Sequence, residues 1–333
     1  MPRGRTVRLG LRAAALLAAL AMHTIAALAT AAPARPGFAV GEIVVRFTDS
    51  SRFIVRPGQR RVPRTLVTVI RYPAAGDPSR VDVIGAPPAR TAGPFPLVVF
   101  AHGFDITPAP YARLLRAWTR AGYVVAAPIF PVTNSNAPGG PDESDLINQP
   151  TDVSFVITQL LAANTAAHGI LTGLINAAQI AVSGQSDGGS TALAVADNAH
   201  YADRRVRAAM ILAGAEIPGV GGYAFPPPAP PLLAVQGTAD IFNAPESTYE
   251  FFRLAPRPKF LLRLPGAPHL GPYTYEQPQL GIVEQVTIAF LDRYLKADPG
   301  ARARMWKAGD VPGVAALSRG APRKLKPAGA TRP

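Results

Sequence analysis

Short apolar runs separated by amphipathic stretches make up most of the chain between residues 42 and 296. A run that is apolar at nearly every position is typical of a strand buried on both faces of a parallel sheet. Two other segments, 42–47 and 65–72, are rich in β-branched residues and predict a hairpin-like pair of strands. The continuous apolar runs predict buried strands over residues 97–101, 123–129, 179–182, 210–213, 232–235 and 260–264.

Between these strands, apolar residues recur at the spacing of an α-helix. Segments 191–199 and 248–254 are also predicted to be helical. Strands that alternate with helices in this way predict one α/β domain with a mostly parallel central sheet flanked by helices. The helical stripes, in chain order, contain Tyr111, Leu114, Leu115 and Trp118, then Val153, Val156, Leu160 and Leu161, and finally Val283, Val286, Phe290, Leu291 and Tyr294.

The positive charge of the chain is concentrated at its two ends. The formal net charge is +13, yet the first 31 residues contain four arginines and no acid, and residues 299–333 contain eight cations against Asp310 alone. The middle of the chain is therefore nearly neutral, and no nucleic-acid-binding motif accompanies the charge, so we expect no nucleic-acid partner. The chain has no cysteine, which excludes disulfides, thiolate metal ligands and a cysteine nucleophile.

The charge pattern divides the chain into three parts. Residues 1–31 resemble a secretory signal peptide, because basic residues precede an apolar run and small residues follow it. Cleavage after Ala29 or Ala31 and export from the cell are the predictions, and an uncleaved anchor is the alternative. Residues 32–298 predict the globular domain. Residues 299–333 predict a basic, disordered tail whose charge favours weak tethering to an anionic surface.

Residues 184–188 contain the strongest chemical motif, Gly-Gln-Ser-Asp-Gly, which matches the G-x-S-x-G nucleophile elbow. A predicted strand ends just before the motif and a predicted helix begins just after it, as such an elbow requires. The glycines allow strand and helix to approach closely, and the helix N-terminus brings free N–H groups to the reacting oxygen. Ser186 is therefore the candidate nucleophile. A turn that contains a serine by chance is the alternative.

A serine nucleophile needs a base, and His269 is the best-placed histidine. It lies on a Pro/Gly-rich loop after the last predicted strand, a position suited to presenting a side chain. Asp240 follows the strand predicted over 232–235 and is the candidate carboxylate that orients His269, with Glu216 as its rival. The histidines that are less suitable as the base are His23, His102, His168 and His200.

The attack of a serine on an ester also needs two N–H donors for the developing oxyanion. We expect the backbone N–H groups of Asp187, directly after Ser186, and of Phe104, after the strand predicted over 97–101, to supply them. Gly103 would let this loop turn tightly, and His102 would make structural hydrogen bonds. All these groups follow predicted strands, at the sheet edge where parallel α/β sheets carry their sites.

Two clusters of charged residues are interpreted as solvated loops. One is the arginine cluster over residues 56–64, and the other is the acidic cluster over residues 142–145. A cation site is the alternative for the acidic cluster, but its residues lack a fixed ligand spacing. No metal is therefore expected.

Over residues 42–296 the chain resembles secreted bacterial α/β-hydrolases of the platelet-activating-factor-acetylhydrolase-like, chlorophyllase-like and cutinase-type polyester hydrolase branch. The order of Ser186, Asp240 and His269 is the order of that superfamily. The other carriers of the resemblance are Arg-Thr-Leu at 64–66, Arg-Tyr-Pro-Ala at 71–74, Val-Phe-Ala-His-Gly-Phe at 99–104, Ala-Gly-Tyr-Val-Val-Ala at 121–126 and the elbow at 184–189.

The resemblance implies an α/β-hydrolase fold and the hydrolysis of carboxylic esters without a cofactor, through an acyl-enzyme. It implies that Ser186 attacks, that His269 transfers the proton, that Asp240 orients His269, and that the amides of Phe104 and Asp187 hold the oxyanion. Asp187 departs from the apolar or basic residue that many relatives carry at this position. This departure leaves the acyl preference open.

The connection from Glu216 to Pro231 is too short and too rich in Pro and Gly to form a large cap domain. We therefore expect an open, shallow cleft, lined by Phe104, Ile241 and Phe242, that accepts short-acyl or polymeric esters. The predicted function is that of a secreted, monomeric serine esterase with an ester substrate. The alternatives are an amidase or thioesterase with the same triad, and a catalytically inactive binding protein at the cell surface.

Overall fold

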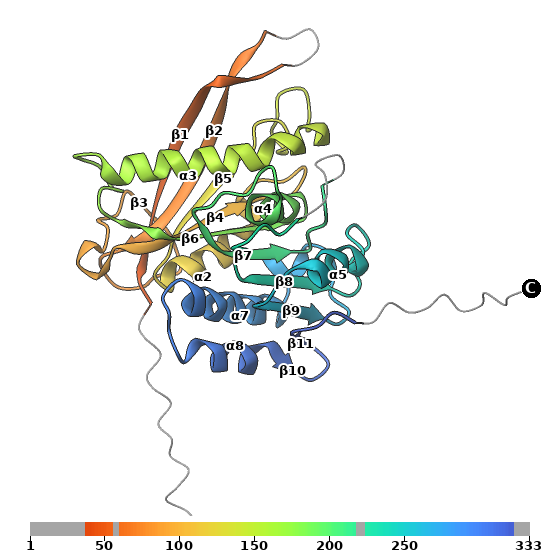
Figure 1. Cartoon of the computed structure of the whole chain (residues 1–333). Helices are drawn as coiled ribbons and strands as arrows, with labels where there is room; N and C mark the ends of the chain where they lie inside the picture. Colours follow the sequence, from red (N-terminus) through yellow and green to blue (C-terminus); the bar gives the residue numbers. More distant parts are fainter. Residues whose placement is uncertain (1–36, 56–59, 218–223, 323–333) are drawn as a thin grey trace, which may run out of the picture. The chain divides into compact units, whose positions relative to one another are not determined.

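One eleven-stranded sheet organises the residues that the computed structural model describes, which are 37–55, 60–217 and 224–322 (Figure 1). The predicted signal peptide, residues 1–31, lies outside the described residues. Each central strand contains one of the runs predicted as a buried strand, and the prediction of a mostly parallel central sheet is confirmed. These six parallel strands are β4 (Phe95–Ala101), β5 (Val124–Ile129), β6 (Ile175–Gln185), β7 (Val206–Leu212), β8 (Leu232–Gly237) and β9 (Lys259–Leu264), adjoining in the order β9-β8-β7-β6-β4-β5.

The predicted hairpin-like pair extends this sheet beyond β5. β1 (Ala39–Ile54) and β2 (Val62–Ala74) pair antiparallel, β2 pairs antiparallel with β5, and the short β3 (Val83–Ile84) lies parallel to β1. Both long strands extend past the predicted ranges of 42–47 and 65–72. The outer ends of the pair mix exposed with buried side chains, and they therefore lack the continuous apolar pattern of the central strands.

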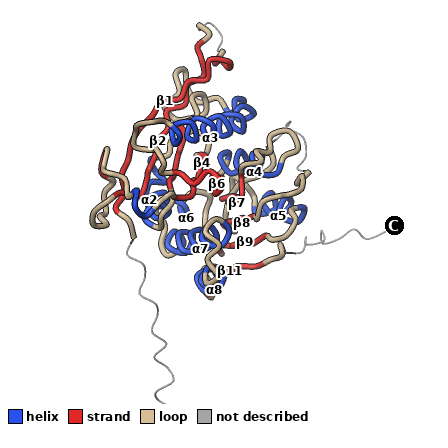
Figure 2. Tube along the Cα trace, turned by 60° about the vertical axis from the view of Figure 1, so that its left-hand side comes forward, coloured by secondary structure: helices blue, strands red, loops and turns tan. Residues whose placement is uncertain are grey.

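Helices cover both faces of the sheet (Figures 1 and 2). One face is covered by α3 (Gln149–Thr165), α4 (Asp187–Asp197) and α5 (Pro245–Leu254). The other is covered by α2 (Ala112–Arg120), α6 (Gly271–Thr274), α7 (Gln279–Tyr294) and α8 (Ala301–Gly309). Three short 3₁₀ turns complete the described elements: η1 (Arg90–Ala92), η2 (Ala109–Tyr111) and η3 (Glu143–Asn148).

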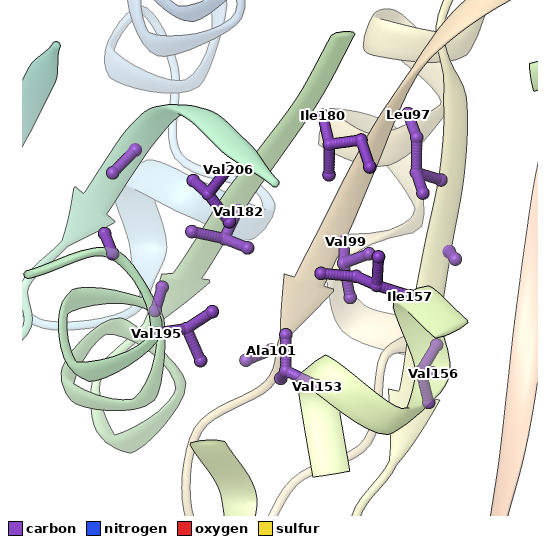
Figure 3. Packing of buried hydrophobic residues seen from close by; sticks show 14 of the residues in the cluster. Leu97, Val99, Ala101, Val153, Val156, Ile157, Ile180, Val182, Val195 and Val206 are labelled. Atoms are coloured by element: carbon purple, nitrogen blue, oxygen red, sulfur yellow. The ribbon is translucent and has the colours of Figure 1, made fainter. Parts of the chain in front are cut away.

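The core has two layers, one on each side of the sheet. Successive side chains of a strand point to opposite faces, so Val99 of β4 joins one layer and Phe100 joins the other. Figure 3 shows the first layer, where Val99 lies beside Ile157 of α3. Because both faces are buried, every residue of β4 is buried, which explains its continuous apolar sequence.

The prediction of a disordered tail from residue 299 is wrong for residues 299–322. This segment forms α8, β10 (Asp310–Val311) and β11 (Ala315–Ser318), and β11 pairs antiparallel with β9. Met305 and Leu317 are buried in the core layer that contains Phe100. The pattern of apolar residues is weak in this segment, because its helix and strands are short and bury few apolar residues, and because many of its other residues are cations. Residues 323–333 lie outside the described part of the chain.

The interpretation of the arginine cluster as a solvated loop is wrong for Arg64. Its side chain is only 2% exposed and lies between two carboxylates. Arg64 donates two hydrogen bonds to Asp152 of α3, at 2.7 Å from both Nε and Nη2, and two to Asp145 of η3, at 3.0 and 2.5 Å. The planar guanidinium suits this paired arrangement. β2 is thereby bound to the helix that covers its face, and Asp145 is not part of a solvated acidic loop.

The connection from β7 to β8 contains no helix or strand in its described residues, 213–217 and 224–231. Within its described residues, this connection therefore contains no helix that could belong to a large cap domain, as the sequence predicts. No helix within the described ranges is long and apolar enough to cross a membrane.

Candidate active site

Ser186 stands on a sharp turn between β6, which ends at Gln185, and α4, which begins at Asp187. Its backbone has φ 57° and ψ −124°, a conformation that residues with a side chain rarely adopt and that costs of order 1–3 kcal/mol. A Cβ on Gly184 would overlap the carbonyl of Gly188, and a Cβ on Gly188 would overlap the carbonyl of Ala101 in β4. The two motif glycines therefore permit a close approach of α4 to β4 and β6, which holds the turn.

Ser186, His269 and Asp240 form one hydrogen-bonded row. The Oγ of Ser186 lies 2.8 Å from Nε2 of His269, and Nδ1 of His269 lies 2.7 Å from Oδ2 of Asp240. A carboxylate accepts hydrogen bonds, so Nδ1 carries the proton and Nε2 is left to accept from the serine hydroxyl. This arrangement gives the serine a base and gives the base a partner that fixes its tautomer.

The carboxylate of Asp240 is held on both oxygens. Its Oδ1 accepts the backbone N–H groups of Phe242 at 3.0 Å and Asn243 at 2.9 Å. Its Oδ2 accepts Nε2 of Gln236 at 3.1 Å in addition to His269. The rival carboxylate, Glu216, is exposed and makes no hydrogen bond with His269 among the described residues. The geometry therefore joins Asp240 to the histidine.

The remaining described histidines lie elsewhere. His168 and His200 are exposed. His102 is fully buried, and its Nε2 accepts the backbone N–H of Phe130 at 3.0 Å while its Nδ1 lies 2.7 Å from the carbonyl of Gly103. Burial lowers the pKa of His102 to about 4, so the ring is neutral at pH 7, with its proton on Nδ1. These bonds support the structural role expected for His102.

Gln185 and Tyr111 form a second hydrogen-bonded row that the sequence analysis missed. The hydroxyl of Tyr111 donates to Oε1 of Gln185 at 2.7 Å, and Nε2 of Gln185 donates to the backbone carbonyl of His269 at 2.9 Å. Burial raises the pKa of Tyr111, which keeps its hydroxyl protonated. Gln185 thus joins η2 to the loop that carries His269. The sequence feature that could have indicated this role of Gln185 is a long polar residue at the buried end of β6, directly before the nucleophile.

The loop after β4 reaches Ser186 directly. A Cβ on Gly103 would lie 3.2 Å from Cβ of Ser186 and 3.1 Å from Oε1 of Gln185, so the glycine is needed for this close contact. The positive φ in this loop is that of Asp105, at 53°. Phe104 lies between these two residues and is half-buried.

Asp187 is the first residue of α4, so its backbone N–H has no acceptor within the helix. Its carboxyl is half-buried, and Oδ2 has no hydrogen-bond partner among the described residues. Burial, with a smaller contribution from the negative charge of Glu143, raises the pKa of Asp187 to about 6, and the nearby His269 opposes this shift. Ser186 therefore has a carboxyl beside it that changes its charge near neutral pH.

The rim of the site is apolar and open to solvent. Ile241 is 88% exposed and Phe242 is 75% exposed, in the loop that follows Asp240. The ring of Phe242 lies 5.2 Å from the ring of His269, between centroids. Of the three residues expected to line the cleft, Phe242 is thus placed beside the triad, Ile241 adjoins it in the chain, and Phe104 follows the glycine that contacts Ser186.

No group of three or more His, Asp or Glu side chains that could hold a metal occurs in the ranges that the structure describes. The acidic cluster at residues 142–145 is therefore not such a group. Asp145 is bound to Arg64, and Oδ1 of Asp142 accepts the backbone N–H of Ser144 at 3.0 Å.

Comparison with known proteins adds a family and a fold. Residues 57–222, just under half of the chain, match the family model described as Chlorophyllase. This range contains Gly103 and Ser186 but ends before Asp240 and His269. A ferulic acid esterase from Streptomyces cinnamoneus has a similar structure, with a TM-score of 0.59 and 22% identity over 81% of this chain and 93% of that chain. No curated protein sequence matches the chain.

These matches agree with the parallel sheet and with the elbow on which Ser186 stands. The structural similarity establishes the fold, and the family match shows that residues 57–222 are similar in sequence to the Chlorophyllase family. The resemblance noted from the sequence motifs is confirmed at this level. The chain has the α/β-hydrolase fold, and its similarity to the Chlorophyllase family and to a ferulic acid esterase supports the interpretation that it is a carboxylic ester hydrolase.

Proposed function

We propose that this ester hydrolase acts by nucleophilic catalysis, with Ser186 as the nucleophile, His269 as the general base and Asp240 as the residue that orients it. The observation that carries the proposal is the pair of hydrogen bonds made by His269, 2.8 Å to Oγ of Ser186 and 2.7 Å to Asp240. Each bond has the length that proton transfer and tautomer control require.

In the acylation step, Oγ of Ser186 attacks the ester carbonyl carbon while its proton passes to Nε2 of His269. The imidazolium that forms is stabilised by Asp240. The tetrahedral intermediate then breaks its bond to the alcohol oxygen, which leaves with the proton from His269. In the second step, water gives a proton to His269 and attacks the acyl group, and the acid product leaves as Ser186 regains its proton.

The negative oxygen of each tetrahedral intermediate needs two donors. We assign this role to the backbone N–H groups of Phe104 and Asp187. The support is positional: the loop that contains Phe104 contacts Ser186 through Gly103, and the N–H of Asp187 lies at the start of α4. The helix dipole adds a favourable potential at this end of α4.

The proposed substrates are short-acyl esters or the exposed ester bonds of a polymer. The support is the solvent-exposed rim formed by Ile241 and Phe242, which offers apolar contact at the surface. The ring of Phe242, beside His269, offers a stacking surface for an aromatic acyl group. Esters of ferulic acid, the substrate class in the name of the structural neighbour, therefore belong in the substrate panel.

The proposed location is outside the cell. This proposal rests on the basic and apolar sequence of residues 1–31 and on the absence of cysteine, which makes the domain independent of the redox state of its surroundings.

Replacing Ser186 by Ala is expected to abolish labelling by a fluorophosphonate probe and to lower kcat/KM for p-nitrophenyl butyrate by about 10⁴-fold or more, because the nucleophile is removed. Ser183→Ala is the matched control. Ser183 lies on the same strand, and its buried Oγ has no hydrogen-bond partner among the described residues. This variant should keep near-wild-type labelling and activity.

Three results would contradict the proposal: no labelling of the folded wild type, an active Ser186→Ala variant, or equal losses in both variants. Rates on matched ester, thioester and anilide substrates test the bond type, and the ester should be fastest. A preference for long-chain esters over butyrate would contradict the open rim.

Tyr111→Phe is expected to lower kcat three- to tenfold, equivalent to about 1 kcal/mol, because Gln185 loses the bond that orients its amide toward His269. Burst titration should show the same number of active sites, and KM should change little. Tyr273→Phe is the control, since Tyr273 is equally buried but its hydroxyl donates to the carbonyl of Val235. Equal effects of the two variants on kcat would show that only stability had changed.

Asp187→Asn is expected to raise kcat/KM for a neutral ester at pH 8, by roughly three- to tenfold, because it removes a negative charge beside the oxyanion. Asp187 has a pKa of about 6, so the gain should disappear near pH 5, where the wild-type carboxyl is protonated. For the same reason the ionised carboxyl destabilises the fold above pH 6, and the variant should melt higher at pH 8 but not at pH 4.

Glu143→Gln is the comparison for this experiment, because Glu143 contributes to the raised pKa of Asp187. It should move the pH dependence of the wild type toward lower pH and leave the rate at pH 8 nearly unchanged. A ratio of variant to wild-type rate that is constant from pH 5 to pH 8 would refute the role assigned to Asp187.

A further inference from the structure

Two neighbouring cavities, of about 410 and 360 Å³, lie where β9 begins. They share Arg257, Lys259 and Arg319 in their linings, and neither lining contains an acidic residue. We name the pair of cavities the cationic groove and define it by the six cations that line it: Arg253, Arg257, Lys259, Arg293, Arg302 and Arg319.

The cationic groove lies at the sheet edge opposite the active site. Lys259 is the first residue of β9, whereas the catalytic residues follow the other ends of the parallel strands, at Gln185, Gly237 and Leu264. The other cations come from α5, α7, α8, the residue after β11 and, for Arg257, the connection between α5 and β9. A ligand here would therefore leave the triad accessible.

Two cations of the groove, Arg319 and Lys259, are held in place by groups that carry no opposite charge. The guanidinium of Arg319 lies 5.8 Å from the ring centroid of Phe260 and 5.7 Å from that of Trp306. Nζ of Lys259 donates to three carbonyls at the end of α5, at distances of 2.6 to 3.0 Å. Contacts with ring faces and helix carbonyls fix a cation but leave its charge.

Arg253 is paired with an acidic residue, whereas Lys259 lies close to another cation. Within the described ranges, the ion pair that reaches the cationic groove is that of Arg253 with Glu246, at 2.5 Å. The pKa of Lys259 is lowered by burial and by the positive charge of Arg257, which is the electrostatic consequence of crowding like charges. Binding an anion would relieve this repulsion.

The end of the described chain adds to the same charge. Arg253 also donates to the carbonyl of Pro322, at 2.8 Å, and Ala321 lines one of the cavities. Residues 299–322, predicted as part of a disordered tail, instead supply Arg302 and Arg319 to a surface with a defined shape.

The shape and chemistry of this surface distinguish among polyanions. The cations line cavities, which a thin polymer chain can enter and a planar membrane cannot. Among the described residues of α5, Leu254 is the large apolar side chain that is exposed near these cavities. Phe260 is buried and the guanidinium of Arg319 lies against the rings of Phe260 and Trp306, which reduces the aromatic surface that could stack on nucleic-acid bases. We propose that the cationic groove binds an anionic polysaccharide and so anchors the enzyme to an acidic polymer.

The test is binding of full-length enzyme to polygalacturonate, measured by calorimetry in 50 mM and 500 mM NaCl. The wild type should bind at low salt and lose binding at high salt. The double variant Arg257→Gln/Arg302→Gln should bind at least tenfold more weakly, with unchanged hydrolysis of p-nitrophenyl butyrate. Neither residue makes an ion pair in the described structure, so the variant is expected to fold.

The control is Arg46→Gln/Arg80→Gln, which removes the same charge from exposed residues at the β1 side of the sheet. It should bind as the wild type does. The proposal is overturned if the groove variant binds normally or if the control loses as much affinity. It is also overturned if vesicles of phosphatidylglycerol or a single-stranded oligonucleotide bind more tightly than the polysaccharide through the same two arginines.

Discussion

The close packing of α4 against β4 and β6 is the constraint on which the site depends. Because Gly184 and Gly188 have no side chains, the first turn of the helix lies directly against two strand backbones. The chain between β6 and α4 then has no room for a relaxed turn, and Ser186 is held at φ 57°. The surrounding sheet and helices, with both faces buried, supply the stability that offsets this local strain.

Around this turn, hydrogen bonds fix the buried polar side chains, so that each of them has one role in the site. Asp240 is saturated by backbone and side-chain donors, His102 bonds on both ring nitrogens, and Gln185 is fixed between Tyr111 and the loop of His269. His269 is then the ring whose free nitrogen faces the serine. Asp187 differs from the others, because one oxygen of its half-buried carboxyl lacks a partner among the described residues, and burial of this carboxyl raises its pKa.

The sequence predicted the central strands and the members of the site because both leave local signals. A strand buried on two faces must be apolar at every position, and the elbow needs glycines on either side of Ser186. Local sequence does not contain the partner of a side chain. Arg64 was therefore mistaken for a solvated residue, although Asp145 and Asp152 enclose it, and the role of Gln185 was missed. The short strand β11 was missed because its stability comes from pairing with β9.

The crystal structure of the enzyme after reaction with a p-nitrophenyl alkylphosphonate would test the proposed site most directly, since the adduct resembles the tetrahedral intermediate. We expect phosphorus bonded to Oγ of Ser186, Nε2 of His269 beside the leaving-group position, and the phosphoryl oxygen about 3 Å from the backbone nitrogens of Phe104 and Asp187. An adduct on another residue, or a phosphoryl oxygen directed away from both amides, would contradict it.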